Sequence, residues 1–328
     1  MIGAPANAPL LEVRDLSVAF GTPERPLPAV EGVGFDLPAG GALGLVGESG
    51  SGKSVTALSI LRLIASPGRI TGGCIRFQGT DLLALPEAAL PEIRGRDIAM
   101  VFQEPMSSLN PLMTIGDQVE EAILLHQELS RADRRARAVE LLRLVGIPDP
   151  ASRLAAYPHE FSGGMRQRVM IAMALACTPK LLIADEPTTA LDVTIQAQVL
   201  ALIARLREAT GTALLLISHD LGVIAEMCDR VVVLYAGRIV EQGAVRAIFH
   251  RAAHPYTQGL LEAVPRLDDD RARLAQIPGS VPMPGQAGPG CPFVMRCTRA
   301  LPRCAEEMPP LVALDGDHRA ACWVTAPP

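Results

Sequence analysis

The sequence has few aromatic residues and no long apolar run, and these absences exclude several classes of protein. Only 3% of its 328 residues are aromatic, although 49% are hydrophobic. The longest uninterrupted apolar run, Val169 to Cys177, falls far short of the ~18 residues that a membrane-spanning helix needs. We therefore expect a globular chain, long enough for more than one domain, that does not itself span a bilayer.

Strong charge of one sign is also missing. The net charge is −5, and no basic cluster interleaved with aromatic residues is present, so no nucleic acid partner is expected. The first residues, 1–7, carry neither a basic region nor an apolar region, and secretion is therefore not supported. The expected compartment is the cytoplasm.

The most informative stretch lies near the start of the chain, between the apolar run 42–46 and a helical pattern that begins near Val55. It matches the pattern G-x-x-x-x-G-K-S/T completely, and its residues are Gly47, Glu48, Ser49, Gly50, Ser51, Gly52, Lys53 and Ser54. In such a loop the backbone N–H groups wrap around a polyphosphate at the N-terminus of a helix. Lys53 would reach the β- and γ-phosphates, and the Ser54 hydroxyl would ligate Mg²⁺. The sequence therefore predicts a binding site for a nucleoside triphosphate.

Several later residues have two possible interpretations when each is taken alone. Asp185 and Glu186 end the apolar strand 181–184, where ligands of open α/β sheets bind, and buried carboxylates there need a cation or a reacting water. Ser162 could simply cap the helix that follows it, and His219 could be a turn residue after the strand 212–218. Phe20 is either a core or edge aromatic or a ring that stacks on adenine.

The remaining pattern predicts a mixed α/β chain with a helical insert. Expected strands cover residues 10–14, 16–20, 30–37 and 98–102, with hairpins over 70–79 and 231–241. Helical periodicity marks 115–125 and 131–145, and a further apolar helix should run from about 163 to 177. From about His250 the chain becomes rich in Pro and Gly, and we expect a loop-rich extension that does not continue the sheet.

The order and spacing of these motifs resemble the ATP-binding subunit of an ABC transporter over roughly residues 10–250. The resemblance implies a P-loop NTPase (RecA-like) α/β core with an antiparallel β subdomain over residues 8–250, and a helical insert at about 104–165. It also implies ATP and Mg²⁺ as cofactors, held by the loop 47–54. The implied roles are adenine stacking for Phe20, Mg²⁺ and water sensing for Gln103, Mg²⁺ binding for Asp185, general base for Glu186 and γ-phosphate contact for His219.

The resemblance also implies a composite site. Ser162, Gly163 and Gly164 match the family's signature motif, which acts on the ATP of a partner subunit, and Ala190 to Asp192 match its D-loop. Phe161 and Met165 depart from the commoner signature Leu-Ser-Gly-Gly-Gln: the methionine removes a side-chain amide near the nucleotide, while Ser162 and the glycine backbone remain. Two such subunits would close head to tail around ATP and separate after its hydrolysis.

Residues 251–328 resemble the C-terminal extension of the oligopeptide and dipeptide importer ATPases, on motifs such as 254–257, 277–279 and 290–293. The segment carries four of the seven cysteines of the chain: Cys291, Cys297, Cys304 and Cys322. Four thiols in a loop-rich segment of a reducing compartment favour a metal over disulfides, but their spacing does not identify it. The resemblance implies a 4Fe-4S iron–sulfur cluster; zinc and free thiols are the alternatives.

The expected function is ATP hydrolysis that drives import of dipeptides or oligopeptides. The implied partners are a homologous ATPase, most simply in a heterodimer, two membrane permease subunits and an extracytoplasmic solute-binding protein. The chain would lie peripherally on the cytoplasmic face of the cell membrane. The alternatives are an importer ATPase for nickel or another solute, and a soluble ABC-type ATPase outside transport, which would need a coiled-coil insertion or tandem cassettes that the sequence lacks.

Overall fold

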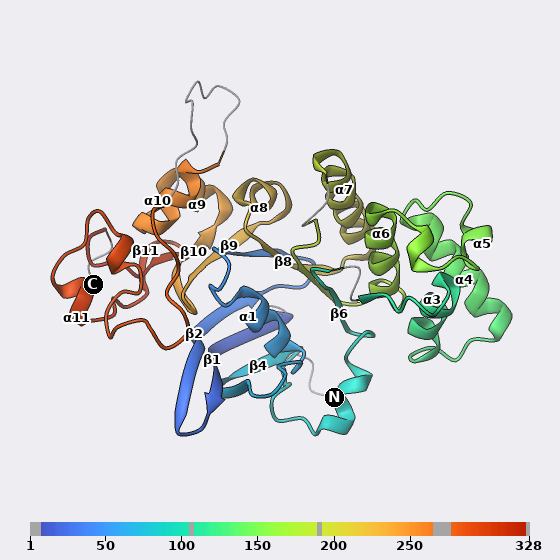
Figure 1. Cartoon of the computed structure of the whole chain (residues 1–328), viewed down its shortest axis with the longest axis horizontal. Helices are drawn as coiled ribbons and strands as arrows, with labels where there is room; N and C mark the ends of the chain where they lie inside the picture. Colours follow the sequence, from blue (N-terminus) through green and yellow to red (C-terminus); the bar gives the residue numbers. More distant parts are fainter. Residues whose placement is uncertain (1–7, 105–107, 189–191, 265–276, 326–328) are drawn as a thin grey trace. The chain divides into compact units, whose positions relative to one another are not determined.

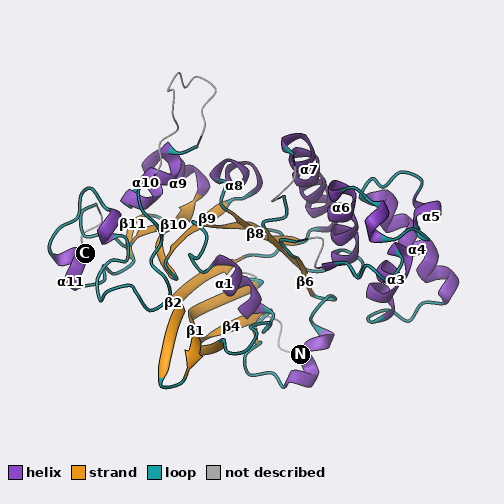
Figure 2. Ribbon diagram, in the orientation of Figure 1, coloured by secondary structure: helices purple, strands orange, loops and turns teal. Residues whose placement is uncertain are grey.

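The computed structural model describes residues 8–104, 108–188, 192–264 and 277–325. The chain forms two compact units, the first made of residues 1–84 and 216–328 and the second of residues 85–215. Strand β8 (Ala213–Ser218) begins in the second unit and ends in the first. Figures 1 and 2 show the elements of each unit.

An antiparallel sheet opens the first unit, with strand order β2-β1-β4-β5. Figure 1 labels β2, β1 and β4 of this sheet. The strands are β1 (Leu11–Thr22), β2 (Arg25–Leu37), β4 (Arg69–Phe77) and β5 (Thr80–Asp81). The two strands predicted over 10–14 and 16–20 are one strand, because a shift in register near Asp15 lets the chain bulge and continue. The hairpin predicted over 70–79 was also misplaced: β4 runs through Gly72 and Gly73, and its turn to β5 is formed by Gln78 and Gly79.

A second sheet of the first unit carries the phosphate loop. Strand β3 (Ala42–Val46) is fully buried and pairs in parallel with β9 (Arg230–Tyr235), which forms the predicted hairpin with β10 (Arg238–Ala244). The helices of this unit are α1 (Lys53–Ile60), α8 (Leu221–Met227), α9 (Val245–Arg251), α10 (Pro255–Glu262) and α11 (Arg303–Glu306), with a short 3-10 turn η3 (Val294–Arg296).

The C-terminal extension continues this sheet, and the prediction that it would not was wrong. Strand β12 (His318–Ala320) pairs with β10, and β11 (Val312–Asp315) pairs with β12. The pairing is anchored by Glu241 of β10, whose buried carboxylate accepts hydrogen bonds from His318 Nε2 at 2.7 Å and from the backbone N–H groups of Ala253 and His254 at 2.7 and 2.8 Å. A buried carboxylate needs such donors, so the extension and the sheet stabilise each other.

The second unit combines two parallel strands with a group of helices (Figure 2). Strands β6 (Ile98–Val101) and β7 (Leu181–Asp185) pair in parallel. The helical elements are η1 (Glu87–Glu92), α3 (Ile115–Leu124), α4 (Arg131–Leu144), α5 (Pro150–Arg153), η2 (Pro158–Glu160), α6 (Gly163–Ala174) and α7 (Val193–Thr210). Helices α3 and α4 confirm the two helical patterns that the sequence places at 115–125 and 131–145. Among the described residues, no helix has both the length and the hydrophobicity to cross a membrane.

Candidate nucleotide site

The loop Gly47–Ser54 connects β3 to α1, as the sequence predicts. Its backbone has a positive φ at all three of its glycines, with Gly50 at 79°. Gly47 has φ 153° and Gly52, the N-cap of α1, has φ 98°. A Cβ atom at Gly47 would lie 2.3 Å from the carbonyl oxygen of Leu234, so no larger residue fits there without displacing the backbone. The loop therefore packs closely against the neighbouring strand β9.

Lys53 is bent back over this loop. Its side chain is 5% exposed, and its ammonium donates to the carbonyl oxygens of Gly47 at 2.7 Å and Glu48 at 3.0 Å. The hydroxyl of Ser51 is buried and has no hydrogen-bond partner among the described residues. This loop suits a polyphosphate, because it combines a positive charge, an unsatisfied hydroxyl and the start of a helix.

The parallel strands of the second unit bring Gln103 and Glu186 together. Val101 of β6 is paired with Ala184 of β7, so both strands end at the same edge. Just beyond this edge, Gln103 Nε2 donates a hydrogen bond to Glu186 Oε2 at 3.2 Å. Glu186 has φ 44°, a strained left-handed conformation for a non-glycine residue, which is common at functional sites. Asp185 precedes it at the end of β7 and is 5% exposed.

The predicted signature residues open α6. Ser162 is its N-cap, and its hydroxyl accepts a hydrogen bond from Met165 N at 3.3 Å, so the capping interpretation of this serine is confirmed. Ser162 and Gly163 are exposed. At Gly164 a Cβ atom would lie 2.6 Å from Ile195 of α7, which explains the glycine by close helix packing. The capping role leaves the exposed face of this turn available to a partner.

The remaining predicted residues are Asp192, His219 and Phe20. Asp192 caps α7 by accepting from Ile195 N at 2.9 Å, while Ala190 and Leu191 of the predicted D-loop lie outside the described residues. His219 is exposed between β8 and α8. Phe20 is half-buried on β1, close to Gly68, so its role at adenine stays a prediction.

The four C-terminal thiols lie near one another. Cys291, Cys304 and Cys322 are buried, and Cys297 is partly buried. Burial, together with the charges of the other three thiols, raises the pKa of Cys291 to about 11. Iron and zinc bind cysteine as the thiolate, but in the described part of the chain no three His, Cys, Asp or Glu side chains are arranged to hold a metal ion.

Sequence reasoning missed two residues that contact the phosphate loop from the extension. Tyr256 accepts a hydrogen bond from Glu48 N at 2.8 Å, and Arg296 forms an ion pair with the Glu48 carboxylate at 3.0 Å. Such contacts join residues that are far apart in the sequence, and no local pattern reveals them. Tyr256 does lie in the motif 254–257 and is one of only three tyrosines, but neither observation links it to the phosphate loop.

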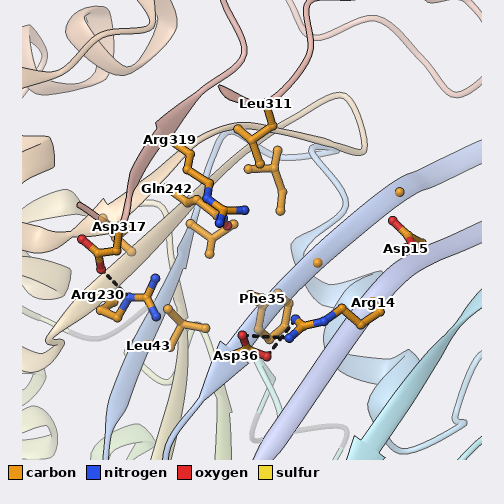
Figure 3. Close-up of a pocket in the computed structure, with 15 residues that line it drawn as sticks. Arg14, Asp15, Phe35, Asp36, Leu43, Arg230, Gln242, Leu311, Asp317 and Arg319 are labelled. Carbon is orange, nitrogen blue, oxygen red and sulfur yellow. Dashed lines mark hydrogen bonds and ion pairs between the residues drawn. The ribbon is translucent and has the colours of Figure 1, made fainter. Parts of the chain in front are cut away.

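The first unit also has a separate hollow of about 550 Å³. Figure 3 shows the residues that line it. Its walls carry Arg14 paired with Asp36 at 2.8 Å and Arg230 paired with Asp317 at 3.0 Å (Figure 3). Arg319 and Asp15 also line it, so positive and negative side chains balance. None of the predicted site residues lines this hollow, and its charges do not favour one ligand.

Comparisons with known proteins agree with the motifs. Residues 30–189 match the ABC transporter family, and residues 240–304 match the C-terminal region of oligopeptide/dipeptide transporters. The chain is 54% identical over 316 residues to a probable peptide ABC transporter ATP-binding protein of Sinorhizobium fredii, covering 96% of this chain and 94% of that protein. It is 51% identical over 319 residues to the oligopeptide transport ATP-binding protein OppD of Salmonella typhimurium, covering 97% of this chain and 94% of that protein.

Among solved structures, the dimeric ATP-binding cassette MJ0796 bound to ADP and Pi matches with a TM-score of 0.65 and 28% identity, covering 72% of this chain and 99% of that one. The predicted fold class, an ABC-type P-loop NTPase, is therefore confirmed. The chain belongs to the ATP-hydrolysing, ATP-binding subunits of ABC transporters, within the oligopeptide/dipeptide transporter family.

Proposed function

We propose that this chain hydrolyses ATP to drive uptake of dipeptides or oligopeptides across the cytoplasmic membrane. Two features of the same chain together support the proposal. The lysine of the phosphate loop is folded over that loop, and residues 240–304 match the C-terminal region of peptide transporters. The names of the relatives support a peptide as the solute.

Each residue at the nucleotide has a role that follows from its chemistry. The loop 47–54 binds the phosphates through its N–H groups, and the Lys53 ammonium binds the β- and γ-phosphate oxygens. Ser54, Gln103 and Asp185 would hold Mg²⁺, which neutralises phosphate charge when it is bound. Phe20 would stack on the adenine ring.

Hydrolysis needs a base and an oriented water. The Glu186 carboxylate takes the proton as the water oxygen attacks the γ-phosphorus, the bond to the β-phosphate oxygen breaks, and ADP and phosphate leave. Gln103, within 3.2 Å of Glu186, keeps that carboxylate oriented. His219 would contact a γ-phosphate oxygen.

The site is proposed to be shared between two subunits. Ser162 and Gly163 are exposed at the start of α6, so with Gly164 they can reach an ATP held by a homologous subunit, most simply in a heterodimer. Asp192 would lie at the same interface. Further partners are two membrane permease subunits and an extracytoplasmic solute-binding protein, and the chain would bind peripherally at the cytoplasmic face of the membrane.

The test is ATP turnover by the chain assembled with its proposed permease and solute-binding partners. We expect turnover to rise when dipeptides or oligopeptides are added, and Lys53→Ala to abolish it. The absence of peptide stimulation would overturn the proposal for peptide import. Stimulation by nickel complexes instead would assign another solute.

We also propose that Cys291, Cys297, Cys304 and Cys322 bind a 4Fe-4S cluster, supported by four thiols of which three are buried. Protein purified without oxygen should then contain iron and acid-labile sulfide and absorb visible light. Cys297→Ser should reduce all three signals, whereas Cys74→Ser, on β4, should not. Zinc without colour, or no metal, would overturn the proposal.

A further inference from the structure

Glu48, the second residue of the phosphate loop, is held by two residues of the C-terminal extension. Its backbone N–H donates to the Tyr256 hydroxyl at 2.8 Å, and its carboxylate lies 3.0 Å from Nη1 of Arg296. Its carbonyl oxygen accepts from Lys53, as described above. The backbone and side chain of this one loop residue are therefore fixed together.

Arg296 is itself fixed by the extension. Its side chain is 6% exposed, and the guanidinium donates to the carbonyl oxygens of Pro278 at 2.8 Å and Ile277 at 3.0 Å. It also donates to the Tyr235 hydroxyl at 3.2 Å and lies 5.8 Å from the ring centre of Phe293. A guanidinium with this many fixed acceptors has little freedom, so it presents its charge to Glu48 in one orientation.

Tyr256 belongs to an aromatic group in an aromatic-poor chain. It is fully buried on α10, with its ring 4.6 Å from that of Tyr235 and 5.4 Å from that of Phe293. Burial raises the pKa of Tyr256, so its hydroxyl stays neutral and available as an acceptor. These rings give the hydroxyl a rigid position against the loop.

The ion pair also neutralises the negative charge that Glu48 places beside the proposed phosphate site. A carboxylate beside a polyphosphate repels it, and the repulsion grows where the surroundings exclude water. Glu48 is only 29% exposed. The charge of Arg296 offsets that of Glu48. The extension approaches the loop a second time where Gly50 and residues 282–285 and 287–290 line a hollow of about 330 Å³.

We propose that Arg296 and Tyr256 are positioning residues for the phosphate loop, so that the C-terminal extension sets how tightly the chain binds ATP. This inference rests on the proposed role of residues 47–54 in binding the phosphates. It assigns the extension a function at the nucleotide that does not depend on whether the cysteines bind a metal.

The test measures the dissociation constant of Mg²⁺-ATP by calorimetry on the full chain, and kcat and KM in the assembled transporter. Arg296→Met should weaken ATP binding about tenfold, because the Glu48 charge is then unbalanced and the loop is less restrained. Arg296→Lys should recover part of the affinity. Tyr256→Phe, which keeps the ring and removes the acceptor, should weaken binding and raise KM with a smaller change in kcat.

The decisive variant is the double change Arg296→Met with Glu48→Gln. Removing the carboxylate should restore most of the lost affinity, which a merely structural role of Arg296 would not allow. Arg303→Met is the matched control, since Arg303 lies in the same extension, pairs with Glu307 at 3.0 Å and packs on Trp323. It should bind ATP as the unchanged chain does.

Lys53→Ala separates failure of this inference from failure of the proposed function. If Lys53→Ala loses ATP binding but Arg296→Met keeps full affinity, the positioning role is overturned and the phosphate loop stands. If Arg296→Met weakens binding and Glu48→Gln restores none of it, the positioning role is also overturned. If Lys53→Ala binds ATP normally, the proposed function of the loop is itself wrong.

Discussion

Replacing Glu241 with glutamine should destabilise the first unit strongly, although the substitution is nearly isosteric. The carboxylate is completely buried and accepts three hydrogen bonds, from Ala253 N, His254 N and His318 Nε2. A carboxamide has one oxygen instead of two, and its NH₂ group would face one of the two backbone N–H donors. At least one buried donor must then lose its partner.

The expected cost follows from the number and kind of bonds lost. A hydrogen bond to a charged group contributes about 1.5–3 kcal/mol, and an unsatisfied buried donor costs about 1–3 kcal/mol. We therefore expect Glu241→Gln to lower the free energy of unfolding by about 3 kcal/mol. For a cooperative unit of about 150–250 residues, this corresponds to a fall in Tm of roughly 6–12 °C.

Thermal unfolding of the full chain, followed by circular dichroism or calorimetry at neutral pH, measures this fall. The matched control is Glu226→Gln, the same chemical change on the exposed surface of α8, which should alter stability by no more than about 0.5 kcal/mol. If the two variants unfold at the same temperature, the carboxylate does not join the extension to β10, and the reasoning is refuted.

Three further predictions concern the catalytic base, the subunit interface and the pH dependence of stability. Glu186→Gln should keep ATP binding but stop hydrolysis, trapping a closed dimer in size-exclusion chromatography with ATP. Ser162→Arg, which places a bulky charge on the exposed first turn of α6, should leave ATP binding by the isolated chain unchanged yet prevent ATP-dependent dimerisation. Burial lowers the pKa of His254 to about 3, below its unfolded value near 6.5. The stability that the neutral imidazole contributes is therefore complete above pH 6.5 and is lost as the pH falls. Below pH 6 the unfolding free energy should decrease by about 1.4 kcal/mol per pH unit. In His254→Asn, whose amide oxygen can still cap α10, the unfolding free energy should decline less steeply in that range.

Each of these predictions has an outcome that contradicts it. Rapid turnover by Glu186→Gln would exclude this residue as the base. Normal dimerisation of Ser162→Arg would remove the signature turn from the subunit interface. Parallel stability profiles for His254→Asn and the unchanged chain between pH 6.5 and 4.5 would show that His254 is not held neutral by burial.

The features that the sequence predicts well are those set by local chemistry. The loop Gly47–Ser54 needs glycine where the backbone is left-handed and a lysine where it can turn back, and both needs are visible in the sequence. The pairing of Gln103 with Glu186 is likewise foreseeable in outline, because each residue follows an apolar strand and such strands end at one edge of a parallel sheet.

The features that the sequence does not predict depend on contacts between distant residues. Asp15 and Gly73 look like breaks, yet both lie in a bulge where β1 and β4 stay paired, because the neighbouring strand supplies hydrogen bonds across the irregularity. Tertiary packing alone determines that β12 pairs with β10 and that Arg296 contacts Glu48. Composition identified the extension as loop-rich but gave no sign of where it would pack.

The pairing of β12 with β10 also has a consequence for synthesis of the chain. β10 leaves the ribosome well before residues 318–320 exist, so during that interval its edge has no β12 to pair with and Glu241 lacks its histidine. An unpaired strand edge on a nascent chain invites association with other strands. The first unit can therefore complete its sheet only when the last part of the chain has been made, and a ribosome that stalls within the extension would leave an ATPase with an open edge.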